Sequence, residues 1–481
     1  MPHITPPAVL RPLALAMERE GARLYLVGGA VRNALLDLPH SDLDVTGALS
    51  QQRVLDLCKE NGIQATVMST ALGTLHIRLG KEIAEYTPFR GEGYAAGGAH
   101  KPVWVRFGVG MREDASRRDF TVNALYADCL TGEVEDPLGG LADLAKKQLR
   151  QCAKDTLRSD ALRLLRLVRF FGELGFSVEE ETLASAQENA PLLRDIAPER
   201  RADELLKILL CDTKYGDPEI AVQGGMLPPL PQSESKCVLE SLQLLERIGA
   251  WEYLIPELAK GRGIKQRQDF HKYTVLEHAF HAAASALPDR TLRMAALLHD
   301  IGKPACFAET GRYHRHAAYG EPLAREALQA LRYPKAFIQE VASLVSMHMY
   351  DIQGEAKEKT LREQFCLYGR DLSAKLIAVR ESDVRGCGTD MAFIAARWRT
   401  LYETMLSDGT PFSLRDLCLG GKELMAASGL PAGELLGKLQ HMLLLHCAKR
   451  PKDNEPVRLS RLAEVYAAEL RKTHEKPKMW G

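Results

Sequence analysis

The segment from Leu24 to Val45 constrains the fold more than any other part of this 481-residue chain. A short apolar run, Leu24 to Val27, predicts a buried strand, and Gly28-Gly29 comes directly after it, before a helical pattern. Adjacent glycines let backbone N–H groups approach a phosphate closely, and the N-terminus of a helix favours an anion. A glycine pair before a helix is more often a plain turn, so it predicts a phosphate site only in combination with nearby acidic residues.

Two aspartates, Asp42 and Asp44, stand one residue apart after this helix. On a strand, residues i and i+2 project to the same face, so we expect two adjacent carboxylates. Mg²⁺ is their natural occupant, because it takes oxygen ligands from one or two carboxylates and substrate phosphates. Glu85, in the predicted strand Ile83 to Phe89, is a candidate third carboxylate, although a surface position explains it equally well. An isolated Asp-x-Asp is usually a solvated turn; the preceding glycines favour the metal site.

The chain as a whole predicts an α+β protein with four parts. We expect a mixed-sheet head over residues 1–140, a helical neck over 141–215, a second helical domain over 238–388, and a helical body or tail over 389–481. Apolar residues of helical period after Leu162 predict a neck helix that Gly175 can end. A segment rich in Gly, Pro and Ser, Gly216 to Ser235, predicts the boundary between neck and second domain.

Composition limits the classes of function. The net charge is zero and the sequence pI is about 7.2, so any nucleic-acid site must be a local patch. The ten cysteines form no Cys-x-x-Cys pair, which argues against a zinc ribbon and suits a reducing compartment. No signal peptide and no apolar run near the roughly 20 residues of a membrane span is apparent, so we expect a cytoplasmic protein without membrane contact. Nothing indicates an oligomer.

At this point the sequence resembles a known superfamily. Leu26 to Arg32 followed by Asp42-Leu43-Asp44 is similar to the signature of class II tRNA nucleotidyltransferases and bacterial poly(A) polymerases, and Arg117 to Leu125 and Asp136 to Gly140 resemble two further blocks in the same order. The resemblance covers the first ~210 residues strongly and the remainder more loosely.

The resemblance implies roles for the head residues. Asp42 and Asp44, with Glu85, would form the catalytic centre that holds two Mg²⁺ ions. The expected nucleotide contacts are Gly28, Gly29 and Arg32 for the triphosphate, and Arg118, Asp119 and Asn123 for the sugar and phosphates. The alternative for Arg117 and Arg118 is a structural pairing with Glu113 or Asp114. Asn33 departs from the aspartate that the family usually has.

The neck resembles the family's base-reading motif at Asp160 and Arg163. We expect the two to share a face of one helix, where the carboxylate accepts and the guanidinium donates a hydrogen bond. Cytosine and adenine each offer an amino donor beside a ring-nitrogen acceptor, whereas uracil and guanine do not, so the pair predicts selection of C and A. A solvated ion pair is the alternative, and Ser159 replaces the family's glutamate. Further neck candidates are Arg166 and Arg169 for the nucleotide, and Arg200 and Arg201 for RNA.

The loop from Arg90 to Glu113 resembles the flexible loop that full CCA-adding enzymes keep and C-only enzymes shorten. Ala95 and Ala96 stand near where an acidic residue is common, which leaves the A-adding step less firmly predicted than C addition.

The second helical domain resembles the HD metal-phosphohydrolases. His-Asp followed by Ile-Gly-Lys is far more specific than a lone histidine. Imidazoles and carboxylates together suit Mn²⁺, Ni²⁺ or Zn²⁺. The expected ligands are His278, His299, Asp300, His316, His348 and Asp383; His271, His281 and His314 are weaker candidates. In the tail, Lys422 and Lys438 are expected RNA contacts.

Together these features predict an enzyme that adds C, C and A to tRNA from CTP and ATP. Phosphodiesterase or phosphatase activity of the HD domain is a possible side reaction. Two alternatives stay open: a poly(A) polymerase, and an HD phosphohydrolase whose head is an inactive RNA-binding module.

Overall fold

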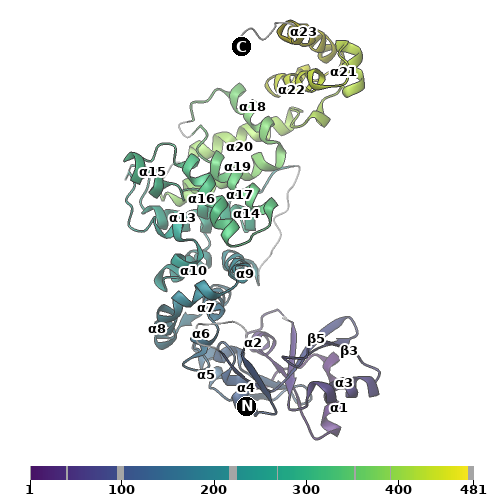
Figure 1. Ribbon diagram of the computed structural model, residues 1–481, viewed down its shortest axis with the longest axis vertical. Helices are drawn as coiled ribbons and strands as arrows, with labels where there is room; N and C mark the ends of the chain where they lie inside the picture. Colours follow the sequence, from purple (N-terminus) through teal and green to yellow (C-terminus); the bar gives the residue numbers. More distant parts are fainter. Residues whose placement is uncertain are drawn as a thin grey trace. The chain divides into compact units, whose positions relative to one another are not determined.

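The computed structural model describes residues 2–39, 42–94, 102–215, 225–267, 269–351, 354–389 and 392–474. The chain divides into two compact units (Figure 1). Unit 1 comprises Met1–Pro218, Ser235–Ala259 and Ala330–Tyr333, and unit 2 comprises Glu219–Glu234, Lys260–Gln329 and Pro334–Gly481. Residues 216–224 of the expected linker lie outside the described residues, as do Ala95 and Ala96 of the expected loop.

Unit 1 begins with a mixed sheet, in which the described residues contribute seven strands in the order β3-β4-β5-β2-β1-β8-β9. β2 runs parallel to β5, and the other neighbours are antiparallel. The strands are β1 (Leu24–Val27), β2 (Leu43–Gly47), β3 (Gln64–Ser69), β4 (Thr74–Leu79), β5 (Glu82–Pro88), β8 (Tyr126–Asp128) and β9 (Val134–Glu135). The strand predicted at residues 24–27 is confirmed to the residue.

Alternation along the strands separates an apolar face of the sheet from a polar one. Leu43, Val45, Ala84 and Tyr86 are buried, whereas Asp44, between two of them, is exposed. Because successive side chains point to opposite faces, Asp44 and Glu85 share the other face. α1 and α3 pack against the sheet and cover part of it (Figure 1). The helices of this region are α1 (Arg11–Arg19), α2 (Gly29–Leu35), α3 (Gln51–Glu60), α4 (Met111–Ser116) and α5 (Gly140–Ala145), and the remaining short strands are β6 (Arg90–Gly93), β7 (Trp104–Phe107), β10 (Gln148–Leu149) and β11 (Ser177–Val178).

The rest of unit 1 is helical and centres on α7 (Leu162–Leu174), which packs against α9 and α10. Leu162, Leu164, Leu165, Leu167 and Val168 are buried, and the helix ends at Gly175 with a φ of +64°, as the sequence predicts. The other helices are α6 (Thr156–Ser159), α8 (Glu180–Asn189), α9 (Pro198–Leu209), α10 (Lys236–Arg247), α11 (Trp251–Leu254) and α12 (Pro256–Ala259).

Unit 2 is helical throughout its described elements. α13 packs against α14 and α19, and a second apolar cluster joins α18 to α21, α22 and α23. The helices are α13 (Val275–Ser285), α14 (Arg290–Leu298), α15 (Lys303–Thr310), α16 (His316–Ala330), α17 (Lys335–Met347), α18 (Glu358–Tyr368), α19 (Arg370–Gly386), α20 (Ala392–Ser407), α21 (Gly421–Ser428), α22 (Glu434–Lys449) and α23 (Pro456–His474). Among the residues that the structure describes, none of the helices is long and apolar enough to cross a bilayer. The expected α+β class, a mixed-sheet head followed by helical regions, is confirmed.

Candidate functional site

Gly28 joins β1 to α2 and lies against Asp44. Its φ of +75° falls in the left-handed region, which side chains disfavour. A Cβ at this position would lie 3.6 Å from Oδ2 of Asp44. Gly29 begins α2, a helix of seven residues. The glycine turn and the second aspartate therefore occupy one site, as the sequence suggests.

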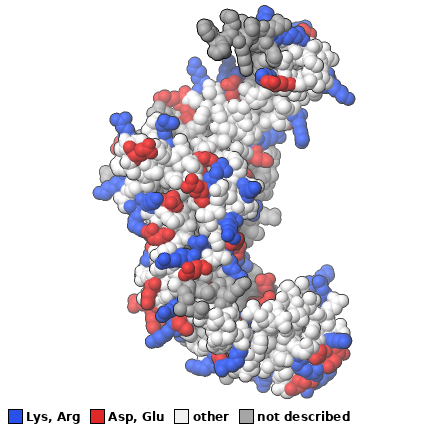
Figure 2. Space-filling model, in the orientation of Figure 1, with Lys and Arg blue, Asp and Glu red and all other residues white. Residues whose placement is uncertain are grey.

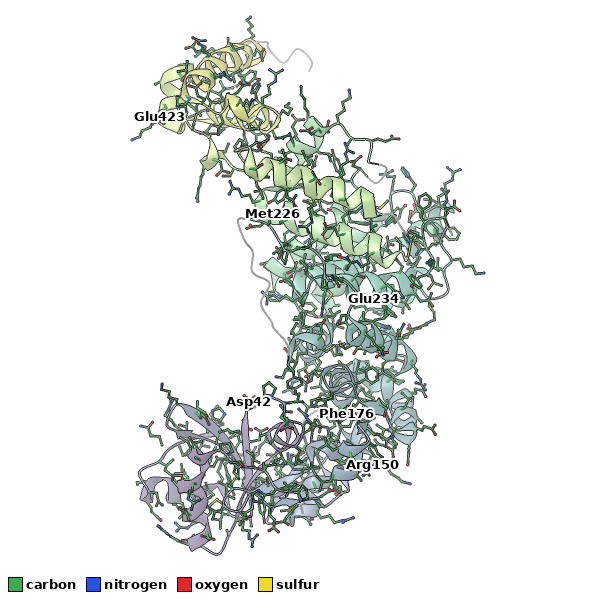
Figure 3. The ribbon with its side chains drawn as sticks, turned by 180° about the vertical axis from the view of Figure 1, so that it is seen from behind. Asp42, Arg150, Phe176, Met226, Glu234 and Glu423 are labelled. Carbon is green, nitrogen blue, oxygen red and sulfur yellow. The ribbon has the colours of Figure 1, made fainter. Side chains whose placement is uncertain are left out.

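The two aspartates do not lie on one strand. Asp42 precedes β2 and is exposed (Figure 3), whereas Asp44 is the second residue of the strand. The expectation of a shared strand is wrong, because the N–H of Asp44 donates to the carbonyl of Asp42 at 3.1 Å and turns the chain there. The carboxylates still interact. Although Asp44 keeps contact with solvent, the surrounding protein atoms partly desolvate its carboxylate. This desolvation, then the negative charges of Glu85 and Asp42, raise the pKa of Asp44 to about 6, against the opposing effect of Arg118 and Arg166.

Glu85 lies directly opposite Asp44 in the parallel pairing of β2 with β5. Its side chain is half-exposed and also faces His76, whose Nε2 lies 3.5 Å from Glu85 Oε2. The neighbouring strand thus places Glu85 beside the aspartates, in the position that a third carboxylate would need. Three acidic groups converge on the polar face of the sheet, where a divalent cation would offset their repulsion.

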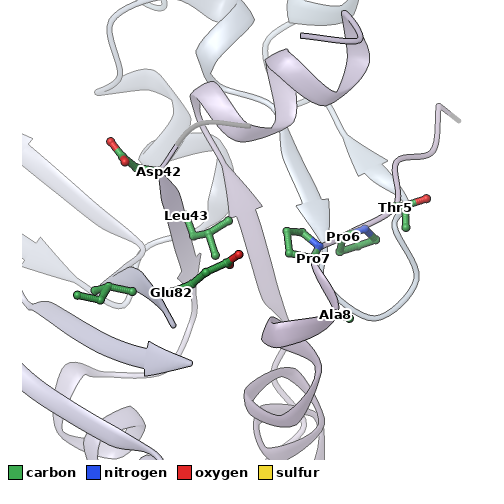
Figure 4. Close-up of a pocket in the computed structure, with 8 residues that line it drawn as sticks. Thr5, Pro6, Pro7, Ala8, Asp42, Leu43 and Glu82 are labelled. Atoms are coloured by element: carbon green, nitrogen blue, oxygen red, sulfur yellow. The ribbon is translucent and has the colours of Figure 1, made fainter. Parts of the chain in front are cut away.

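A pocket of about 630 Å³ adjoins Asp42 in the head. Figure 4 shows its lining, which comes from the chain before β2, the start of β5, and an N-terminal segment that includes Pro6 and Pro7. The sequence carries no motif for this N-terminal lining. Asp42 is the one member of the acidic cluster among the lining residues, so the pocket adjoins the cluster only at its edge.

Arg32 is buried within a hydrogen-bond network. Its Nη1 donates to Asn123 Oδ1 at 2.5 Å, Nη2 donates to Asn33 Oδ1 at 2.8 Å, and Nη2 also donates to the hydroxyl of Tyr215 at 3.1 Å. The guanidinium lies over the ring of Phe170, 5.2 Å from its centroid. The structure thus brings Arg32 and Asn123 together, and Asn33 orients the arginine from the adjacent position.

Arg117 and Arg118 both pair with Asp114, the structural pairing that the sequence left as the alternative. Asp114 is completely buried, and its Oδ2 lies 3.1 Å from Arg118 Nη2 while its Oδ1 lies 2.8 Å from Arg117 Nη2. Tyr126 donates its hydroxyl proton to the same carboxylate at 2.7 Å. Burial opposes ionisation, but the two arginines and Tyr126 lower the pKa of Asp114 to about 2. Arg118 nevertheless acts electrostatically on Asp44, so it stands near the acidic cluster.

Asp119 links the head to α7. Arg166 donates to Asp119 Oδ2 from Nε at 2.9 Å and from Nη2 at 2.5 Å, and Asn123 Nδ2 donates to Oδ1 at 3.1 Å. Despite burial, these partners hold the pKa of the Asp119 carboxyl well below its usual range. Asp119, Asn123, Arg32 and Arg166 therefore form one connected polar group.

Asp160 and Arg163 do not share a helix. Asp160 ends α6 with φ −140° and ψ 99°, an extended conformation, and its Oδ1 accepts from the N–H of Leu162 at 3.1 Å. This expectation is wrong because the aspartate's carboxylate bonds the chain that opens α7. The side chains still meet, with Arg163 Nε 3.8 Å from Asp160 Oδ2. Arg163 also donates to the carbonyls of Thr156 and Arg117.

The remaining neck arginines differ in what they contact. Arg169 pairs with Glu204 of α9 at 3.0 Å and with Glu173 at 3.6 Å. Arg201 donates to the carbonyl of Tyr253 at 2.5 Å, a contact within the helical scaffold. Arg200 is exposed on α9.

The tail lysines are exposed on different helices. Lys422 lies in the first turn of α21, and Lys438 lies 2.6 Å from Glu434, one turn earlier on α22. On the face in view, Figure 2 shows acidic and basic side chains interspersed, which agrees with the zero net charge.

In unit 2 the six expected ligands converge on one buried centre around Asp300. Its Oδ2 lies 3.4 Å from His278 Nε2 and 3.3 Å from His299 Nε2, whereas its Oδ1 lies 2.9 Å from His316 Nε2 and 3.7 Å from His348 Nε2. Asp383 Oδ1 completes the first group, 3.2 Å from His278 Nε2. One carboxylate therefore stands between two groups of imidazoles, and each group together with this carboxylate is a donor set of the kind that holds a metal ion.

The orientation of the imidazoles fits metal ligands. His299, His316 and His348 each direct Nδ1 at a backbone carbonyl, at 2.7, 2.8 and 2.7 Å, which leaves the Nε2 lone pairs directed inward. Nε2 of His316 and of His348 are 3.0 Å apart, and two lone pairs repel at that distance unless a cation lies between them. Asp300 and Asp383 raise the pKa of His299 to about 10 although burial opposes this, so the carboxylates favour a positive charge here.

Sequence reasoning missed three members of this centre. Lys303 Nζ lies 2.5 Å from Asp300 Oδ2, and Arg380 Nη1 lies 2.6 Å from Asp383 Oδ2. Cys387, which directly follows α19, could have been found from its position one turn after Asp383. With His271 and His278 it forms a further group whose ligand atoms lie within 4.8 Å of one another.

Three family models match separate stretches of the chain. Residues 24–150 match the poly A polymerase head domain, residues 175–216 match a probable RNA- and SrmB-binding site of polymerase A, and residues 270–385 match the HD domain. The A-adding tRNA nucleotidyltransferase of Deinococcus radiodurans is 30% identical over 87% of this chain and 90% of its own length. The chain belongs to the tRNA nucleotidyltransferase family.

Other members of the family carry different names. The CC-adding tRNA nucleotidyltransferase of Thermus thermophilus is 31% identical over 87% of this chain and 88% of its own, and the multifunctional CCA protein of Pseudomonas aeruginosa is 32% identical over 76% and 85%. The crystal structure of the Bacillus stearothermophilus CCA-adding enzyme in complex with CTP shares the fold, with a TM-score of 0.65 at 22% identity over 98% of this chain and 99% of the other. The chain is thus a nucleotidyltransferase with an HD domain.

Proposed function

We propose that this nucleotidyltransferase adds C, C and A in turn to the 3′ end of tRNA, with CTP and ATP as substrates. The convergence of Asp42, Asp44 and Glu85 beside Gly28 carries the proposal, because it supplies acidic groups and an open backbone where a triphosphate must approach. An HD phosphohydrolase with an inactive head would not need this cluster.

Asp42 and Asp44 would hold two Mg²⁺ ions, with Glu85 as the third acidic group. The raised pKa of Asp44 supports this fit, because a bound cation would offset the electrostatic repulsion between the crowded carboxylates. Bound there, the ions supply activation of the RNA 3′-hydroxyl and stabilisation of the pyrophosphate leaving group.

The connected group around Asp119 would position the nucleotide. Asp119 and Arg166 fix each other across the head and α7, and Asn123 links them to Arg32. Side chains that already hydrogen-bond to one another lose little conformational entropy when a ligand binds. This network would therefore hold the sugar and phosphates in one orientation. Arg118, held by Asp114, contributes a fixed positive charge beside the acidic cluster.

Asp160 and Arg163 would choose the base. The carboxylate accepts from the amino group of cytosine or adenine, and the guanidinium donates to the ring nitrogen beside it. Uracil and guanine would leave both groups unpaired, which is costly in a buried site. Both residues are largely buried, and Arg163 lies near the ring of Tyr94, 5.8 Å from its centroid.

Which nucleotides the enzyme adds is the main question, because the relatives include A-adding, CC-adding and CCA proteins. We propose the full sequence, because the long, Gly-rich segment from Arg90 to Glu113 resembles the loop that full CCA-adding enzymes keep. Its described ends pair as β6 and β7.

The test uses three tRNA substrates that end at the discriminator base, at C, and at CC, each with one nucleotide at a time. Full CCA addition predicts that CTP extends the first two and ATP extends only the third, to a fixed length. ATP extension of the third alone would identify an A-adding enzyme, and failure on the third a CC-adding one. An open-ended A ladder would support a poly(A) polymerase. Asp44→Asn should abolish every extension.

The paired imidazole groups around Asp300 favour a second candidate activity, phosphoester hydrolysis by the HD domain. The six ligands would hold Mn²⁺, Ni²⁺ or Zn²⁺, which would supply an activated water. Conversion of a 2′,3′-cyclic nucleotide to the nucleoside monophosphate, with each metal added in turn, tests this. Equal rates for wild type and Asp300→Ala would contradict it, and Asp44→Asn should hydrolyse normally.

A further inference from the structure

Three side chains of unit 2, His271, His278 and Cys387, come together beside the buried centre around Asp300. One ligand atom of each lies within 4.8 Å of the ligand atoms of the other two. The rings of His271 and His278 contact each other edge to face, with their centroids 4.8 Å apart. His278 is completely buried, and Cys387 is 8% exposed. The three residues belong to different segments, which are the chain before α13, α13 itself, and the residue that follows α19.

Backbone contacts hold the first and last of these segments together. The N–H of Lys272 donates to the carbonyl of Cys387 at 3.1 Å, and the hydroxyl of Thr389 donates to the carbonyl of Phe270 at 3.1 Å. His271 lies between the two bonded positions of its own segment. The approach of His271 to Cys387 is therefore fixed by the main chain and does not depend on side-chain rotamers alone.

The two imidazoles of this group have ring nitrogens that remain available for a ligand. Among the residues that the structure describes, Nδ1 of His271 and Nδ1 of His278 are buried without a hydrogen-bond partner. Buried polar atoms without a partner are rare in native proteins, so two of them on adjacent rings indicate a missing ligand. Nε2 of His278 is 3.0 Å from Nε2 of His299 and 3.4 Å from Asp300 Oδ2, so this nitrogen belongs to the Asp300 centre. Nδ1 is the atom of His278 that remains.

His278 differs in this respect from the other imidazoles of the Asp300 centre. Metal-binding histidines usually donate their second ring N–H to a carbonyl or carboxylate, which fixes the ring. Nδ1 faces a backbone carbonyl in each of the other three, His299, His316 and His348. A metal ion on Nδ1 would take the place of this missing partner in His278.

A thiolate with two imidazoles is a donor set for Zn²⁺. Zn²⁺ takes sulfur and imidazole ligands in a tetrahedron and can keep one position for water, whereas Mn²⁺ is better suited to oxygen ligands. With bond lengths of about 2.0–2.3 Å, ligand atoms on one Zn²⁺ ion are roughly 3.3–3.6 Å apart. Atoms that already lie within 4.8 Å of one another reach this spacing through small side-chain rotations. The thiol of Cys387 loses its proton when the ion binds.

We propose that His271, His278 and Cys387 form a third metal site of unit 2, which binds Zn²⁺ in addition to the ions of the Asp300 centre. His278 bridges the two through Nδ1 and Nε2, and a cation on each side of the ring favours loss of the second ring proton. The ion ties the chain before α13 to the end of α19. The site includes none of the head residues, so it is tested independently of nucleotide addition.

Cobalt spectroscopy of the full-length protein tests the site, because a thiolate bound to Co²⁺ gives a charge-transfer band in the near ultraviolet. Wild type dialysed against Co²⁺ should bind three equivalents and show this band, whereas Mn²⁺ should fill the Asp300 centre alone. Cys387→Ser should bind two equivalents of Co²⁺ and lack the band. Cys418→Ser is the matched control, since Cys418 is exposed and its loss should change neither readout.

Two further variants separate the third site from the Asp300 centre. His271→Ala removes a ligand without touching the sulfur, so it should also bind two equivalents, and it decides the question if Cys387→Ser does not fold. Asp300→Ala should keep one equivalent and the band.

Three results would overturn the proposal. The first is a wild type without the band, and the second is a band that Cys387→Ser retains. The third is a wild type that shows the band with only two equivalents of Co²⁺, because Cys387 would then be a ligand of the Asp300 centre itself.

Discussion

Asp44 and Glu85 lie opposite each other on the parallel strands β2 and β5, so the sheet itself brings two carboxylates together. Glu85 is one of the charges that raise the pKa of Asp44. The pairing gives Glu85 a possible place in metal binding, but its contact with His76 is a competing structural role.

Glu85→Gln should raise the Mg²⁺ concentration needed for half-maximal nucleotide addition, by roughly tenfold if one ligand group is lost. The substitution also lowers the pKa of Asp44, but this effect is smaller, because Asp44 is already mostly ionised at pH 7. His76→Gln is the control, since it removes the ion pair and keeps the carboxylate. A Mg²⁺ titration that Glu85→Gln leaves unchanged would assign Glu85 to the His76 contact alone.

Asp114→Asn should destabilise unit 1 strongly. The change leaves Arg118 without its buried counter-charge and Arg117 with Glu92 alone, which costs roughly 3–5 kcal/mol in the free energy of unfolding. Glu113→Gln is the matched control, because Glu113 pairs with Arg106 on the surface and should cost about 1 kcal/mol or less. Urea denaturation measures both values.

The same carboxylate predicts a pH dependence. The pKa of Asp114 is about 2 in the folded protein against an ordinary 3.8, so its stabilisation is complete above pH 3.8 and is lost as the pH falls towards 2. Asp114→Asn should therefore flatten the fall in stability over this interval. A difference between wild type and variant that stays constant from pH 5 to pH 2 would contradict the assignment.

Sequence analysis predicted which side chains come together better than it predicted the backbone conformation at each of them. The strand at residues 24–27 and the helix end at Gly175 follow from local patterns, and both are confirmed. Asp42 and Asp160 were placed on regular elements, yet each lies at the edge of one, because a local hydrogen bond turns the chain. Patterns of period two or 3.6 carry no information about such turns.

The same local patterns could not predict contacts between residues that lie far apart in the sequence. The bond between Asp119 and Arg166 spans 47 positions, and nothing in either local motif specifies the other. The HD ligands were found because their motif is dense. Lys303 belongs to the same motif but was given no role, and nothing in the helical pattern around Arg380 marks it, so the two cations that balance the charge of the aspartates were missed.

Arg163→Ala should weaken base selection more than catalysis of the correct step. Without the guanidinium, cytosine loses one hydrogen bond and uracil no longer opposes a buried donor. The ratio of kcat/KM for CTP over UTP should fall by roughly 5- to 150-fold, the equivalent of about 1–3 kcal/mol. Arg158→Ala, on the exposed face of α6, should leave the ratio unchanged. An equal loss for CTP and UTP would instead assign Arg163 to its contacts with the carbonyls of Thr156 and Arg117.

The position of Asp300 between two imidazole groups predicts how metal content responds to substitution. Its two oxygens face different groups, so Asp300→Ala should remove both metal equivalents, whereas His316→Ala should remove one and leave the site formed by His278, His299 and Asp383. His314→Ala is the control, since His314 is exposed two positions from His316 and should leave the content unchanged. Metal analysis after dialysis against Mn²⁺ or Zn²⁺ measures the stoichiometry. The Nε2 atoms of His316 and His348 are 3.0 Å apart, as are those of His278 and His299, so a metal bound in either group would relieve a contact between lone pairs. Loss of both equivalents in His316→Ala would therefore indicate one coupled centre in place of two separable sites.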